Sequence, residues 1–121
     1  MNVEILKQDL SKEYFTPERC HILESSNSTN DKELSIARAR VESGITTAFH
    51  YLDGVTERYI ITQGYGRVQV GNQPTIEVGV GDVVIIPPNT RQRITNIGET
   101  DLIFYALCTP RFKEDSYYSE E

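Results

Sequence analysis

The chain has 121 residues and a formal net charge of −6 at neutral pH, so it is one acidic domain of ordinary size. This charge disfavours nucleic acid and anionic membrane surfaces as partners, because both require a basic face. No apolar run approaches the roughly 20 residues that cross a bilayer, and the N-terminus lacks a signal-peptide pattern, so we expect a cytoplasmic protein with no membrane segment.

The composition favours strands, because Val, Ile, Thr and aromatic residues far outnumber Ala, Leu and Met. All eight glycines lie between Gly44 and Gly98, whereas most charged residues lie outside that stretch. We therefore predict a single all-β domain over 1–121, with a barrel core at about 34–109. An N-terminal extension over 1–33 and an acidic surface tail over 110–121 flank this core.

In chain order, the first predicted element is a short helix over 4–15, followed by an extended segment at 21–24. Short alternating runs then recur at intervals of roughly 8 to 12 residues, with Gly, Asp, Asn and Pro at the turns, as in sandwiches and barrels. These runs predict eight strands, at 34–42, 46–52, 57–63, 66–71, 75–80, 82–87, 91–97 and 102–109.

The core offers few groups for chemistry. Between residues 44 and 109 there is one histidine, His50, and one cysteine, Cys108, with neither serine nor lysine. A serine nucleophile or a lysine Schiff base would need its central residue from the flanking segments, so these mechanisms are disfavoured. The other cysteine, Cys20, is far from Cys108 in the sequence, and we expect two reduced thiols rather than a metal-binding pair.

Two sets of spacings carry a family resemblance. The first set is Gly44, His50, Leu52, Glu57 and Gly64, which matches the first motif of the cupin family. The second set is Gly81, Pro87, Asn89, Gln92 and Asn96, which matches the second motif except that Asn89 replaces a glycine. The chain therefore resembles small single-domain cupins, including sugar-isomerase-like members, and the resemblance implies a double-stranded β-helix, or jelly-roll barrel.

In that family, three histidines and a glutamate hold a divalent metal. Here His50 and Glu57 match two of these ligands, while Leu52 and Gln92 stand where the other two histidines would be. The resemblance thus implies a metal site on His50, Glu57 and Gln92, for Zn, Ni, Mn or Fe. The alternative is a hydrogen-bonded polar cluster in which Gln92 and Asn96 donate to Glu57, and the sequence leaves both open.

Strand alternation extends the candidate site. Tyr59 and Gln63 share the predicted face of Glu57, and Asn96 shares that of Gln92, so these three are candidate ligand-binding residues. Arg38 and Arg40 lie two apart on one strand, where paired guanidinium groups could bind a carboxylate or phosphate. His21 is either a residue over the barrel mouth or an edge-strand histidine.

Two classes of function follow. The first is a barrel that binds a small polar ligand, carbohydrate-like or a carboxylate, with or without a divalent metal. The second is a metal-dependent sugar or sugar-phosphate isomerase or epimerase, with Glu57 and His50 as the catalytic residues. Apolar side chains on both faces of 82–87 and 102–109 further predict a homodimer that covers one outer sheet face.

Overall fold

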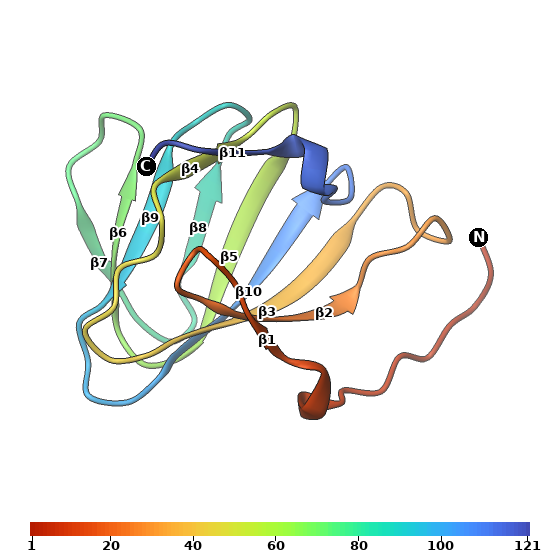
Figure 1. The fold of residues 1–121 in the computed structure, drawn as a ribbon, viewed down its shortest axis with the longest axis horizontal. Coiled ribbons are helices and arrows are strands. Elements are labelled where there is room, and N and C mark those ends of the chain that lie inside the picture. Colours follow the sequence, from red (N-terminus) through yellow and green to blue (C-terminus); the bar gives the residue numbers. More distant parts are fainter.

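The computed structural model describes all residues 1–121 and contains two facing antiparallel sheets (Figure 1). The larger sheet has the strand order β1-β2-β3-β10-β5-β8, and the smaller has the order β11-β4-β9-β6-β7. The strands are β1 (Tyr14–Phe15), β2 (His21–Ser26), β3 (Ser35–Val41), β4 (His50–Leu52), β5 (Thr56–Gln63), β6 (Gly66–Val70), β7 (Ile76–Val78), β8 (Val83–Ile86), β9 (Gln92–Asn96), β10 (Leu102–Thr109) and β11 (Tyr117–Ser119). Two 3-10 turns, η1 (Leu10–Lys12) and η2 (Glu114–Ser116), complete the chain.

The core lies between the two sheets and follows the alternation of the sequence. Along β10, Leu102, Phe104 and Ala106 are buried while their neighbours are only half-buried. Ile94 at the middle of β9 faces them from the smaller sheet and is fully buried. The side chains of one face of each sheet thus close the barrel, as expected for strands with a period of two.

Two turns show why particular residues occupy the motif positions. Gly64, between β5 and β6, has φ +84°, and a Cβ atom there would lie 2.9 Å from the carbonyl oxygen of Asp101. Asn89 adopts φ 59°, the backbone conformation that a glycine at this position would take. Its side chain accepts a hydrogen bond of 3.1 Å from the Gly54 amide, which ties the β8–β9 turn to the β4–β5 turn.

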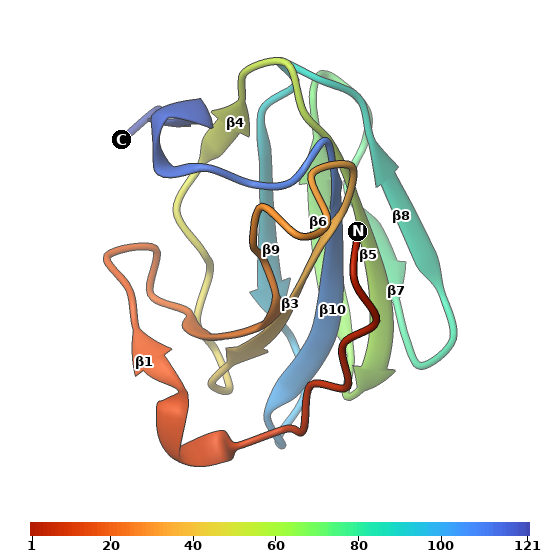
Figure 2. The same cartoon turned by 90° about the vertical axis from the view of Figure 1, so that its right-hand side faces the viewer.

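The structure confirms the all-β barrel and corrects three details. The predicted helix over 4–15 is wrong, because only the short turn η1 forms and Leu6 and Leu10 stay exposed. The strand predicted at 46–52 is limited to β4. The predicted surface tail ends in β11, which pairs with β4 and lies beside it in Figure 2. No helix in the structure has the length and apolar character needed to span a bilayer.

Candidate functional site

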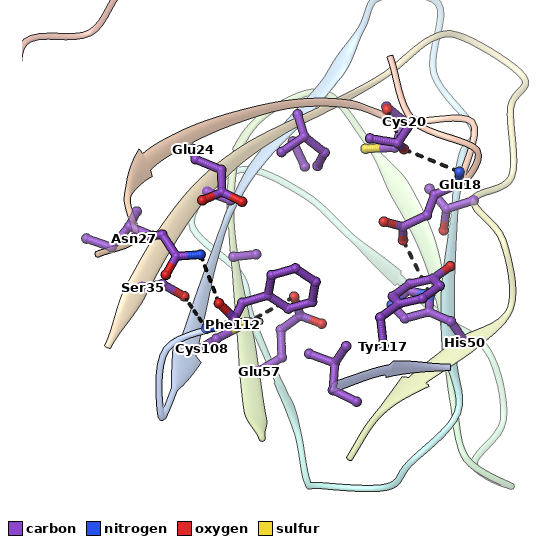
Figure 3. Close-up of a pocket in the computed structure, with 18 of the residues that line it drawn as sticks. Glu18, Cys20, Glu24, Asn27, Ser35, His50, Glu57, Cys108, Phe112 and Tyr117 are labelled. Atoms are coloured by element: carbon purple, nitrogen blue, oxygen red, sulfur yellow. Dashed lines mark hydrogen bonds and ion pairs between the residues drawn. The ribbon is translucent and has the colours of Figure 1, made fainter. Parts of the chain in front are cut away.

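A cavity of about 420 Å³ lies inside the barrel, at the end where β3, β4 and β5 begin and β10 ends (Figure 3). Most of the residues that line it are hydrophobic, and a few polar side chains converge on it. This size and this lining are typical of pockets that bind small molecules. The β1–β2 loop and the C-terminal segment supply two of its walls through Glu18 and Tyr117.

His50 is the first residue of β4 and is buried, with 5% of its surface exposed. Its Nδ1 lies 2.9 Å from the carbonyl oxygen of Ala48 and 3.5 Å from the carboxylate of Glu18. Its ring stacks on that of Tyr117 with centroids 4.8 Å apart. The carbonyl holds the Nδ1 proton, so in the neutral ring Nε2 is unprotonated, and no protein group bonds it. His50 is therefore oriented to act as a base.

Glu18 is a site residue that the sequence did not indicate. It lies in the loop between β1 and β2, and its backbone carbonyl accepts a hydrogen bond of 3.0 Å from the Ala48 amide. This bond places its carboxylate against His50, with 26% of the side chain exposed. Burial raises the pKa of Glu18, and the neighbouring His50 offsets part of that shift. Glu18 thus positions the imidazole from outside the barrel motifs.

Glu57, near the start of β5, also lines the cavity. Its Oε2 accepts a hydrogen bond from the Cys108 thiol at 3.6 Å, whereas its Oε1 is closed to solvent and has no hydrogen-bond partner. Burial raises the pKa of Glu57, with His50 opposing the shift and Glu18 adding to it. The protonated carboxyl therefore persists above the ordinary pH range of a glutamate, and Glu57 can donate a proton.

Tyr59 and Gln92 form a buried pair next to this group. The Tyr59 hydroxyl donates to Oε1 of Gln92, and the two side chains are 3% and 1% exposed. Tyr59 lines the cavity, as predicted. The oxygen of Gln92 that would bind a metal instead accepts this hydrogen bond, and Leu52 packs with Val55 and Cys108 in an apolar cluster.

These contacts test whether the chain fits a resident metal. No group of three His, Cys, Asp or Glu side chains is arranged to hold a metal ion. With Leu52 apolar and Gln92 bound to Tyr59, the donor set does not fit one. The polar cluster differs from the predicted one, in which Gln92 and Asn96 donate to Glu57, because Oε1 of Gln92 accepts from Tyr59 and Asn96 donates to backbone carbonyls.

Asn96 and Gln63 lie outside the cavity. The Asn96 amide donates to the carbonyl oxygens of Val41 at 2.8 Å and Thr100 at 2.9 Å, so it braces the opposite end of the barrel. Gln63 is exposed at the end of β5 and donates to the carbonyl oxygen of Asp101 at 2.9 Å. The structure does not bring these two predicted ligand-binding residues to the site. Each is the last residue of its strand, and that end of β5 and of β9 is remote from the cavity.

The predicted arginine pair lies on the outer surface. Alternation along β3 turns Arg38 and Arg40 away from the cavity, and both pair with Glu13, at 3.1 Å and 2.6 Å. Arg40 also pairs with Asp101 at 3.1 Å. His21 lies 3.9 Å from the same Glu13 and does not line the cavity. Both arginines, which were predicted to bind a ligand carboxylate or phosphate, are thus paired with carboxylates of the protein itself.

Comparison with known proteins places the chain in a family. Residues 37–108 match the family model described as the cupin domain. The chain belongs to the cupin family. Among curated proteins, this cupin is 33% identical over 81 residues to an uncharacterized protein of Methanocaldococcus jannaschii. That match covers 67% of this chain and 64% of the archaeal protein, so it spans less than two thirds of that relative.

Solved structures agree on the fold. KdgF from Halomonas sp. superposes with a TM-score of 0.80 at 14% identity, covering 94% of this cupin and 98% of that chain. A nucleoside dehydratase from Streptomyces gives 0.77 at 18% identity, covering 96% and 91%. The formate complex of oxalate decarboxylase from Lactobacillus farciminis gives 0.77 at 24% identity, covering 90% and 33%. At these identities the likeness establishes the double-stranded β-helix and nothing about the ligand.

Proposed function

We propose that this cupin binds a small hydroxylated, carbohydrate-like molecule directly through its side chains, and that His50 and Glu57 transfer protons on it. The supporting observation is that one cavity holds two complementary groups. His50 has Nδ1 fixed by Ala48 and an unbonded Nε2, while Glu57 has an unpartnered Oε1 and a raised pKa. Such a pair supplies a base and an acid in one cavity.

The proposed chemistry is a balanced proton transfer. His50 takes a proton from a carbon of the ligand at Nε2, and Glu57 gives its proton to a ligand oxygen. This combination fits isomerisation, epimerisation or loss of water, and Glu18 serves as the positioning residue for His50. The pair requires no metal, so the proposal departs from the metal-dependent isomerase that the resemblance implied.

The charge of the cavity separates the two predicted ligand classes. No arginine or lysine lines it, whereas four glutamates do. A carboxylate or sugar-phosphate ligand would find no cation there, and it would face like charges. An uncharged polyol meets no such penalty, because the polar groups of the wall can donate and accept hydrogen bonds. The geometry therefore supports the carbohydrate-like ligand over the carboxylate.

The test is a binding screen followed by a proton-exchange measurement. Protein dialysed against EDTA is mixed with neutral sugars and nucleosides, and thermal stabilisation is recorded. Each hit is then followed by NMR in heavy water. We expect at least one hit, with solvent exchange at a ligand carbon that is lost in His50→Gln and Glu57→Gln. Arg38→Gln, on the outer surface, is the matched control and should keep the exchange.

Binding without exchange would contradict the proton-transfer role and leave a binding protein. Absence of any stabilisation by neutral compounds would contradict the proposed ligand class as well. Stabilisation that appears only when Zn, Ni, Mn or Fe is added would restore the metal-dependent alternative.

We also propose that the protein is a homodimer through the outer face of β5 and β8. Ile60, Val83 and Ile85 point outward from these neighbouring strands and are 37%, 56% and 66% exposed. Because β8 is also the edge strand of the larger sheet, a second copy would cover both the apolar face and the free edge. Light scattering at micromolar concentration should give a dimer mass, and Ile85→Glu should give a monomer. A monomer in the unmodified protein would contradict this. The cytoplasmic location stays a prediction.

A further inference from the structure

A second pocket, of about 380 Å³, lies on the outer face of the smaller sheet. It shares no residue with the cavity inside the barrel. Three arginines, three threonines and one glutamine line it, with no hydrophobic residue and no carboxylate among them. In a chain with a net charge of −6, this pocket therefore gathers positive charge in one place.

Strand pairing brings these side chains together, because β6 and β9 are neighbours in the smaller sheet (Figure 1). The residues between them are buried, so alternation turns four side chains outward: Arg67, Gln69, Arg93 and Thr95. Arg67 is the register partner of Thr95, and Gln69 is that of Arg93. Thr46 pairs with Thr95 on the other side, and the two hydroxyls lie 2.8 Å apart. The register therefore sets Arg67 and Arg93 diagonally across one small area, within reach of each other's long side chains.

Two of the guanidinium groups are fixed in place but keep free N–H groups. Arg93 donates from Nε to Gln69 at 2.9 Å and lies over the Phe49 ring at 4.6 Å, while its two Nη atoms have no protein partner. Arg19 donates from Nε to a backbone carbonyl at 2.8 Å and from both Nη atoms to Glu121. A guanidinium carries five N–H donors in a planar fork, so these oriented groups still have donors for the oxygens of an anion.

Two carboxylates at the margin limit the kind of anion. Arg67 pairs with Glu77 at 3.3 Å, and Arg19 pairs with Glu121 at 2.9 Å. The side chains of Arg67 and Glu77 are 49% and 66% exposed, so this ion pair is weak and an anion can replace it. With both glutamates counted, Arg93 leaves one positive charge in excess. An extended polyanion would run into the two carboxylates, whereas a small anion fits between them.

We propose that this pocket binds the phosphate group of a small organic molecule, with Arg67 and Arg93 as its main ligands. A guanidinium fork matches phosphate oxygens with two parallel hydrogen bonds. One hydroxyl of the Thr46–Thr95 pair donates to the other, so the accepting hydroxyl keeps its own proton for the ligand. The pocket is larger than one phosphate group, which leaves room for an organic part beside Thr75. This site lies outside the barrel cavity and is independent of the proposed function.

The test is a titration of the full chain at constant ionic strength and about pH 7.5, where a phosphate group is mostly a dianion. The probes are inorganic phosphate, glycerol 3-phosphate, glucose 6-phosphate and adenosine monophosphate, with glycerol, glucose and adenosine as uncharged partners. Amide chemical shifts in NMR give both the affinity and the place of binding. We expect saturable shifts at Thr46, Arg67, Arg93 and Thr95 with the phosphate compounds and none there with the uncharged partners. At least one organic phosphate should bind about tenfold or more tightly than inorganic phosphate.

Arg93→Gln and Arg67→Gln should each reduce this affinity about tenfold or more, because each removes charge-assisted hydrogen bonds to the phosphate. Arg67 is exposed, so Arg67→Gln keeps the fold even where Arg93→Gln lowers stability. Arg91→Gln is the matched control, since Arg91 lies over the same Phe49 ring at 4.9 Å but does not line the pocket. It removes the same charge and should change the affinity less than about threefold.

An equal loss in Arg91→Gln would overturn the proposal, because the effect would then come from net charge and not from this pocket. Shifts that sodium chloride reproduces, or that map to the barrel cavity, would overturn it as well. Binding of inorganic phosphate alone would replace the organic phosphate with the free ion.

Discussion

Replacement of Asn96 tests whether this residue stabilises the fold, as its contacts indicate, or binds the ligand, as its strand position predicted. Its side chain donates to the carbonyl oxygens of Val41 at 2.8 Å and Thr100 at 2.9 Å and accepts from the Gly98 amide at 2.9 Å. Asn96 is only 1% exposed, so water does not replace these partners freely. At about 1 kcal/mol for each net hydrogen bond, Asn96→Ala should lower the free energy of unfolding by about 3 kcal/mol.

For a domain of this size, that loss corresponds to a decrease in Tm of about 12 °C, which calorimetry measures directly. Asn96→Asp should cost at least as much, because it sets a carboxylate against two carbonyl oxygens. Gln63→Ala, which removes one exposed hydrogen bond, is the control and should change the free energy by less than about 0.5 kcal/mol. Ligand affinity measured below the lowered Tm should not change. A loss of stability below about 1 kcal/mol, or a tenfold loss of affinity, would refute this reasoning.

Three further outcomes follow from the cavity and the C-terminal strand. Burial raises the pKa of Glu57 in the folded state above the ordinary value of 4.5, so this carboxyl lowers the stability of the fold as the pH rises above 4.5. Glu57→Gln should therefore raise Tm at about pH 7 and not at about pH 4. An equal shift at both pH values would contradict this. Ala106→Phe fills the cavity from β10 and should reduce ligand affinity at least tenfold without lowering Tm, whereas unchanged affinity would mean that the ligand binds elsewhere. The Arg19 guanidinium and the Phe49 amide both donate to the Glu121 carboxylate and lower its pKa to about 2. Glu121→Gln weakens these contacts, so it should speed amide hydrogen exchange in β11 at neutral pH. Unchanged exchange would show that the Arg19–Glu121 ion pair does not stabilise β11.

Alternating sequence patterns predicted most of the barrel, because a strand with one buried face repeats every two residues. That rule holds for β9 and β10, where buried and half-buried residues alternate throughout. It fails for the helix predicted over 4–15, since Leu6 and Leu10 have no apolar surface to cover and stay exposed. It also fails for β11, a three-residue strand that pairs with the distant β4 and whose Tyr118 ring stacks on that of Tyr51 at 5.2 Å.

The candidate site was predictable only where the motifs supply it. The spacing placed His50 and Glu57 in the barrel, and both line the cavity. Glu18 and Tyr117 reach the same cavity from a loop and from the C-terminal segment, far from His50 in the sequence. No local pattern connects them to the motifs, because their positions are fixed by long-range contacts such as the backbone bond between Glu18 and Ala48.

The two departures from the family motif change the chemistry of the cavity together. Leu52 packs in an apolar cluster and Gln92 is bonded to Tyr59, so neither of these two positions offers a free metal ligand. The groups that remain in the cavity are the imidazole of His50 and carboxyls such as that of Glu57, which can accept and donate protons. Burial raises the pKa of Glu57 although His50 opposes the shift, so the motif glutamate that would have held a metal instead keeps its proton above the ordinary pH range of a carboxyl. The loss of the metal ligands therefore leaves a neutral acid beside a base, which is the pair that the proposed proton transfer needs.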